Sequence, residues 1–273
     1  MNSKKAKSEP ATRSFIERHA VFTTAEFRSA FPAGTPSSTV LNRLKQAHES
    51  GHVERIRHGV YASRLGALVN TTPDPLLVAS RLKEDYAIAY HSALEAHGVA
   101  HAPFRRVTVV SNRTPLRFEY RGHEFVVRRP PKALMANEGD LWKTMVVPLR
   151  RGDALVNVTS RERTLVDCFE NLKWAGGIEE VLRSVGGFPS LKVQDVIAYA
   201  ELLTSPSATA RVGWVLSADP DMWRVTEEEL RALRSLLGRG PYFLSARSGP
   251  MQYIPEWRLY VPAGLDAAEE MRG

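Results

Sequence analysis

The side chains best suited to recognition chemistry lie between Pro36 and Ser50, on one face of an expected helix. At about 100 degrees per residue, hydrogen-bonding groups gather on that face. They are Ser38, Thr39, Asn42, Lys45, Gln46 and Glu49, with Arg43 at the flank. Asn and Gln can bond adenine at two points and Arg can bond guanine, while hydroxyls and Lys hold phosphate oxygens. A solvated surface helix has a similar polar face, so the neighbouring segments must decide between the two interpretations.

A short basic segment, residues 55–61, follows this helix. It predicts a hairpin with its turn at His58 and Gly59, because glycine gives the backbone freedom there. Arg55, Arg57 and His58 would then lie beside the groove as a wing. The expected DNA contacts are Ser38, Thr39, Asn42, Arg43, Lys45, Gln46, Arg55, Arg57 and His58.

Three closely spaced helices would position these groups. The first is expected over residues 11–20. The second begins at a capping box, in which the Thr23 hydroxyl accepts from the Glu26 amide and the Glu26 carboxylate returns to Thr23. The third starts at Pro36 and stops before Gly51, a residue type that often ends a helix in the left-handed conformation. Its apolar face is expected to contain Val40, Leu41, Leu44, Ala47 and His48.

The charge distribution favours a winged-helix DNA-binding domain over residues 1–69. This segment holds 11 of the 37 Lys and Arg and 5 of the 30 Asp and Glu, a formal charge of +6, whereas the rest of the chain carries +1. Such a concentration attracts DNA phosphates and makes binding depend on salt. The first seven residues include three lysines and no apolar run, so we expect a disordered basic arm and not a signal peptide.

The sequence contains no recognisable motif of catalytic or metal-binding residues. His97 and His101 stand four apart, but Gly98 and Pro103 argue against a continuous helix that would bring both to one metal. No Asp or Glu is followed two residues later by the Lys of restriction-type nucleases. We therefore expect neither enzymatic activity nor a cofactor, and no metal site.

The composition is that of a globular protein, with 43% hydrophobic and 25% charged residues. No apolar run approaches the length that spans a membrane. The single cysteine, Cys168, is expected to be a buried small hydrophobe, which fits a reducing cytoplasm.

A polar, proline-broken linker at residues 70–75 is expected to precede a larger domain over residues 76–273. Strands grouped before helices predict a mixed α+β fold for this domain. The expected strands are 106–111, 118–121, 124–128, 144–149, 155–158, 241–244 and 257–261. The expected helices are 76–83, 90–98, 160–172, 177–185, 191–203, 206–217 and 226–237.

A second cluster of basic residues lies in this domain, and the same segment contains only two acidic residues, Glu119 and Glu124. Its members are Arg105, Arg106, Arg113, Arg117, Arg121, Arg128, Arg129 and Lys132. A solvated face explains the cluster adequately, and a surface for RNA, flanking DNA or an acidic protein is the alternative. Further along, Thr159 and Glu162 fit a capping box, and Arg161, Arg163 and Asp167 are expected at the surface or at a helix end.

Several segments together resemble the AbiEi family of antitoxins from type IV toxin-antitoxin systems. In the first domain the resemblance rests on residues 23–27, 41–44 and 57–61, which many winged helices share. More diagnostic are five segments of the second domain, at residues 90–98, 158–168, 175–181, 210–216 and 255–259. The resemblance spans nearly the whole chain.

This resemblance implies two roles: repression of the protein's own operon through the winged helix, and neutralisation of a cognate nucleotidyltransferase-like toxin. The implied partners are double-stranded operator DNA with inverted repeats, bound by a dimer or by cooperating monomers, and the toxin, with or without direct contact. A regulator whose C-terminal domain senses a ligand, and a DNA-targeted nuclease, remain the alternatives.

Overall fold

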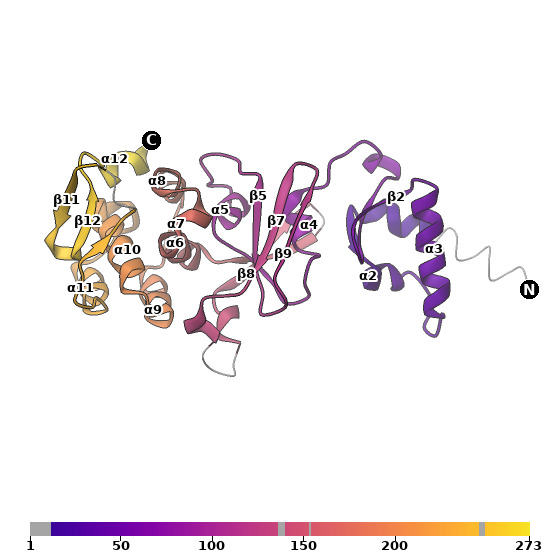
Figure 1. Cartoon of the computed structure of the whole chain (residues 1–273), viewed down its shortest axis with the longest axis horizontal. Coiled ribbons are helices and arrows are strands. Elements are labelled where there is room, and N and C mark those ends of the chain that lie inside the picture. The colour runs from indigo at the N-terminus through magenta and orange to yellow at the C-terminus, as the bar shows by residue number, and fades with distance from the viewer. Residues whose placement is uncertain (1–11, 136–139, 153, 246–248) are drawn as a thin grey trace, which may run out of the picture. The chain divides into compact units, whose positions relative to one another are not determined.

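The computed structural model describes residues 12–135, 140–152, 154–245 and 249–273 (Figure 1). The chain forms two compact units, residues 1–84 with 119–123, and residues 85–118 with 124–273. The division follows Glu84, later than the expected linker at residues 70–75. The expected basic arm lies outside the described residues. Within the described ranges, no helix has the length and apolar character needed to cross a membrane.

The first unit combines short helices with a three-stranded antiparallel sheet. In chain order it contains a helix over residues 12–18, β1 (Val21–Thr23), α2 (Thr24–Arg28), α3 (Ser37–Glu49), β2 (Val53–Arg57), β3 (Val60–Ser63), the 3-10 helix η1 (Gly66–Leu68) and α4 (Pro75–Ala79). The strand order is β1-β3-β2. The sequence did not predict β1, because three residues are too few to show a strand's alternation.

Local signals explain where these helices begin. The capping box at α2 is confirmed, since the Glu26 amide donates to Thr23 Oγ1 at 3.1 Å and the Thr23 amide to Glu26 Oε2 at 2.7 Å. Asp74 caps α4 by accepting from the Leu76 amide at 2.8 Å. After α3, Gly51 has a φ of +69°, as expected for a left-handed residue at a helix end.

One face of α3 packs into the core of this unit. The core consists of Phe15, Ile16, Phe22, Phe27, Phe31, Val40, Leu44, Ala47, Val53 and Leu65. The prediction is wrong for two members of the expected apolar face, since Leu41 is 53% exposed and His48 is also exposed. Val40, Leu44 and Ala47 already form a stripe at i, i+4 and i+7, and residues about 100 degrees to either side fall outside it.

The second unit is built on a six-stranded mixed sheet, apart from residues 119–123, which belong to the first unit. Its strands are β4 (Ala87–Ile88), β5 (Arg106–Val110), β6 (Leu116–Tyr120), β7 (His123–Arg128), β8 (Val146–Arg151) and β9 (Ala154–Thr159). Their order is β6-β7-β5-β4-β9-β8. The pairs β5/β7 and β4/β9 are parallel, and β4/β5 and β8/β9 are antiparallel. The two-residue β4 was not predicted, although it lies in the middle of the sheet.

Helices cover this sheet and separate it from a smaller one. They are α5 (His91–His97), α6 (Arg161–Glu170), α7 (Leu172–Ala175), α8 (Ile178–Gly186), α9 (Val193–Leu203), α10 (Pro206–Ala218), α11 (Glu227–Ser235) and α12 (Ala267–Arg272). The 3-10 helices are η2 (Lys132–Met135), η3 (Leu141–Lys143), η4 (Pro220–Trp223) and η5 (Pro255–Trp257). In Figure 1, α6 to α10 lie between the six-stranded sheet and the C-terminal strands β11 and β12.

The smaller sheet contains β10 (Tyr242–Phe243), β11 (Met251–Ile254) and β12 (Leu259–Pro262) in the order β10-β12-β11. The sequence predicted β10 and β12 but not β11 or α12. The mixed α+β class expected for this unit is confirmed.

The start of α6 differs from its expectation. Ser160, and not Thr159, is the cap, because its hydroxyl accepts from the Arg163 amide at 3.3 Å. Thr159 ends β9 and is buried, with its hydroxyl 2.7 Å from that of Thr164. Glu162 accepts from the Lys192 amide instead of returning to the cap.

Candidate nucleic-acid interface

Helix α3 presents the expected polar side chains on one face. Ser38, Thr39, Asn42, Lys45 and Gln46 are exposed, and Arg43 is half-buried at the boundary with the core. Lys45 pairs loosely with Glu49 at 3.7 Å, and Arg43 Nη1 donates to Gln46 Oε1 at 3.4 Å. These contacts are weak enough to be exchanged for contacts with a base or a phosphate.

Leu41 extends this polar face with an apolar side chain that sequence reasoning had placed in the core. It lies beside Asn42 and one turn before Lys45. Apolar groups in a major groove contact the thymine methyl, so an exposed leucine is compatible with base recognition. Its apolar character fitted the helical pattern equally well, which is why the pattern misassigned it.

Arg28 fixes the turn between α2 and α3, a role that no sequence pattern indicated. Its Nη1 donates to Ser37 Oγ and its Nη2 donates to the Thr35 carbonyl, both at 3.0 Å. Ser37 is the first residue of α3. The orientation of α3 relative to α2 is therefore held by hydrogen bonds as well as by the core.

The hairpin of β2 and β3 turns at His58 and Gly59, as expected, and Gly59 has a φ of +80°. Arg55 Nη2 lies 3.2 Å from His58 Nδ1, so these two exposed side chains meet beside the turn. Arg57 is half-buried, and burial lowers the pKa of its guanidinium. The Thr24 amide donates to the Gly59 carbonyl at 3.0 Å, which ties the turn to the start of α2.

Glu54 is an acidic residue within this basic hairpin, and its charge is neutralised by arginines. It pairs with Arg64 and, at 2.6 Å, with Arg121. Burial raises the pKa of the Glu54 carboxyl, but hydrogen bonds from Arg121 and Arg64 outweigh that effect and lower it to about 2. The carboxylate is therefore compensated and adds little negative potential beside the hairpin.

The structure does not gather the second basic cluster into one unpaired surface. Arg106 and Arg117 both pair with Glu124, and Arg121 pairs with Glu54. Arg106 and Arg128 lie over the ring of Trp174, at 5.0 and 4.7 Å from its centroid. The remaining four members, Arg105, Arg113, Arg129 and Lys132, are exposed.

A buried ion pair lies inside the second unit, where surface residues were expected. Arg163 and Asp167 are 0% and 1% exposed, and Arg163 Nε lies 3.2 Å from Asp167 Oδ2. Arg163 also donates to the carbonyls of Trp142 and Thr144, and Tyr199 donates to Asp167 at 2.6 Å. The expectation of surface positions was wrong because these side chains join α6 to η3 and α9, and a local pattern does not reveal such distant partners.

A second buried polar cluster joins α5 to α8. His91 Nε2 lies 3.0 Å from Glu180 Oε1, and that same oxygen accepts from Ser184 Oγ at 2.8 Å and from the His101 amide at 3.1 Å. The ring of His91 stacks on Phe104 with centroids 3.8 Å apart. Several donors therefore converge on the Glu180 carboxylate and tie α5 to α8, so the geometry supports a structural role.

Within the parts of the chain that the structure describes, no group of three or more His, Cys, Asp or Glu side chains is placed to hold a metal ion. Cys168 is fully buried, as expected, and burial raises the pKa of its thiol.

No model of a known protein family matches the chain. No curated protein matches it either. Among solved structures, it is similar to the crystal structure of the RV2827C protein from Mycobacterium tuberculosis. The two share 15% sequence identity with a TM-score of 0.57, over 98% of this chain and 94% of that chain. At this identity the likeness shows a shared fold.

Proposed function

We propose that the first unit is a winged helix-turn-helix that binds double-stranded DNA, with α3 as the recognition helix and the β2–β3 hairpin as the wing. The chain order of helix, strand, two helices and two strands supports this assignment. The observation that carries it is the face of α3. Five polar side chains there are exposed, while the opposite stripe anchors the helix in the core.

On this proposal, each side chain has a distinct task. Asn42, Arg43 and Gln46 contact base edges in the major groove, and Arg55 and Arg57 hold phosphates. Ser38, Thr39 and Lys45 lie at the start and outer edge of the same face, and His58 lies at the wing turn, where they would contact the backbone.

We further propose that the protein is a cytoplasmic antitoxin that represses its own operon and neutralises a nucleotidyltransferase-like toxin. This part rests on the resemblance to the AbiEi family across both units. Operators with inverted repeats would bind two copies, since a two-fold arrangement of sites matches a two-fold arrangement of recognition helices.

A gel-shift titration with the upstream region of the gene tests DNA binding. We expect Asn42→Ala with Gln46→Ala to reduce the preference for operator over unrelated DNA, at about 1–3 kcal/mol for each lost bidentate base contact. Arg57→Ala should weaken binding to both DNAs alike. The control is Arg231→Ala, which removes an exposed arginine from α11. Wild-type binding by all the variants would refute the assigned face.

A growth assay tests the antitoxin role. The reading frame adjacent to this gene is expressed alone and together with the full chain. The proposal expects arrest by the neighbour alone and recovery on co-expression. A neighbour without nucleotidyltransferase-like sequence, or arrest that the chain does not relieve, would refute this role and leave the DNA proposal standing.

A further inference from the structure

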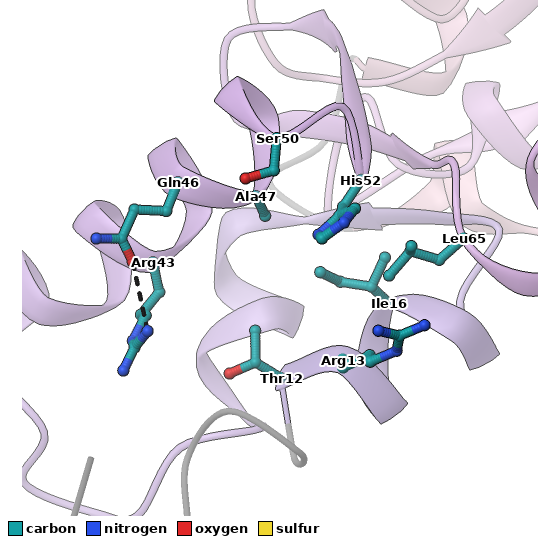
Figure 2. A pocket seen from close by; sticks show the side chains of 9 residues that line it. All are labelled: Thr12, Arg13, Ile16, Arg43, Gln46, Ala47, Ser50, His52 and Leu65. Carbon is teal, nitrogen blue, oxygen red and sulfur yellow. Dashed lines mark hydrogen bonds between the residues drawn. The ribbon is translucent and has the colours of Figure 1, made fainter. Parts of the chain in front are cut away.

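A cavity of about 180 Å³ lies beside the candidate DNA-contact face, between the helix over residues 12–18 and the second half of α3 (Figure 2). Its base is apolar and consists of Ile16, Ala47 and Leu65, which are 1%, 7% and 7% exposed. Figure 2 shows Arg43 and Gln46 on one side of the cavity and Arg13 and His52 on the other. An apolar base with a few converging polar groups is the usual form of a small-molecule site.

Among the described residues, the charges that line the cavity all have one sign. Two guanidiniums, those of Arg13 and Arg43, lie along it, and none of the described lining residues carries a carboxylate. Arg13 pairs with Glu17 at 2.9 Å, but both side chains are well exposed, so water weakens that pair. Arg43 bonds the Gln46 amide oxygen, a neutral group. The cavity therefore favours an anion.

We propose that this cavity binds a small organic anion, and that its ligand competes with DNA for Arg43 and Gln46. The apolar part of the ligand would lie on Ile16, Ala47 and Leu65, and its carboxylate or similar group would bond Arg43. Competition rests on the proposed DNA-binding function, because the same two side chains are assigned there to base contacts. A guanidinium that holds a ligand carboxylate cannot also hold guanine in the same two-point geometry.

The first experiment is a chemical-shift titration of the full-length chain with three probes and no DNA. Benzoate carries both an apolar ring and a carboxylate, benzamide replaces the carboxylate with a neutral group, and inorganic phosphate has charge without an apolar part. We expect saturable shifts with benzoate at residues 12–16, 43–52 and 65. Benzamide and phosphate should each bind at least about tenfold more weakly, because each lacks one of the two contacts.

Two variants and a control locate the site. Arg43→Gln should weaken benzoate binding about tenfold or more, as expected for loss of a hydrogen bond between charged groups. Ser50→Trp places an indole at the cavity and should abolish binding, while the base-contacting residues stay unchanged. Arg18→Gln removes an exposed arginine of the same N-terminal helix that does not line the cavity, and should bind benzoate like the wild type.

The second experiment adds operator DNA. Saturating benzoate should lower DNA affinity, and DNA should lower benzoate affinity by the same factor, since coupling between two sites is reciprocal. The Ser50→Trp variant should bind DNA without responding to benzoate. Absence of shifts with benzoate, equal binding of benzamide or phosphate, or undiminished DNA affinity at saturation would each overturn the proposal. A chain that binds benzoate but no DNA would refute the proposed function and the competition, and would support the site itself.

Discussion

Leu41 and Leu44 have the same side chain on the same helix but occupy opposite environments. Leu44 is 2% exposed inside the core of the first unit, whereas Leu41 is 53% exposed. We expect Leu44→Ala to lower the free energy of unfolding of this unit by about 2–5 kcal/mol, the range for a leucine that leaves a cavity. Leu41→Ala should change it by less than about 0.5 kcal/mol.

Urea titration monitored by circular dichroism measures both leucine variants. Equal losses would mean that Leu41 packs into the core and that the exposed face of α3 is assigned incorrectly. If the proposed base contacts hold, the Leu41 variant should also keep its fold while losing operator affinity, a combination that a core residue does not show.

Arg163 illustrates how strongly a charged residue can depend on distant partners. Replacing it with Met would leave the Asp167 carboxylate buried, with the Tyr199 hydroxyl as its one remaining side-chain partner among the described residues. We expect a loss of about 3–5 kcal/mol, typical of an uncompensated buried charge. Arg161→Met, two residues earlier at a more exposed position, is the control and should cost less than about 1 kcal/mol.

The double variant Arg163→Met with Asp167→Leu separates charge from packing. Because it removes both charges, it should recover part of the stability that the single variant loses. Thermal unfolding of the three variants provides the comparison. A double variant less stable than Arg163→Met would contradict the charge-based explanation.

At the scale of elements, the helices and strands with strong local signals were predicted well. A capping box placed the start of α2 and a glycine placed the end of α3, since those signals lie within a few residues of the boundary they set. The elements that were missed, among them β1, β4, α7, β11 and α12, are two to six residues long. Elements this short leave too few residues for a period to appear, so tertiary contacts define them.

The segments that carry the family resemblance meet one another in the fold. His91, from one segment, bonds Glu180 of another, and His97 Nε2 lies 2.8 Å from the Thr159 carbonyl of a third. Gly213 and Trp257, from the last two segments, pack together. These pairings could not be predicted from the sequence, because helical or strand periodicity carries no information about the partner across the core.

A substitution at Gly213 tests whether the contact with Trp257 limits the size of the side chain that α10 can carry there. A Cβ at this position of α10 would lie 2.1 Å from the ring of Trp257, which is fully buried. Alanine has the better helix propensity by about 1 kcal/mol, but overpacking costs about 1–3 kcal/mol. We therefore expect Gly213→Ala to lower the melting temperature. Ser207→Ala in the same helix should leave it unchanged or slightly higher, and a stabilised Gly213 variant would contradict the close packing.

At the scale of the whole molecule, the basic excess belongs almost entirely to the segment with the candidate DNA contacts. Residues 1–69 carry a formal charge of +6, while the remainder carries +1. Since the second basic cluster is partly paired with Glu124 and Glu54, it adds less free positive charge than its composition implies. Phosphate binding is therefore expected to come mainly from the first unit.

The salt dependence of DNA binding measures how the phosphate contacts are divided between the two units. For the wild type, the logarithm of the association constant should fall linearly with the logarithm of salt concentration, because each bound phosphate releases condensed counterions. Arg57→Ala should reduce the slope by about 1, whereas Asn42→Ala with Gln46→Ala should lower operator affinity at constant slope, since base contacts release few counterions. Arg129→Ala, from the exposed part of the second cluster, should leave both quantities unchanged. If Arg129→Ala reduced the slope as much as Arg57→Ala, the second unit would also contact the DNA backbone, and its arginines would then act alongside the wing.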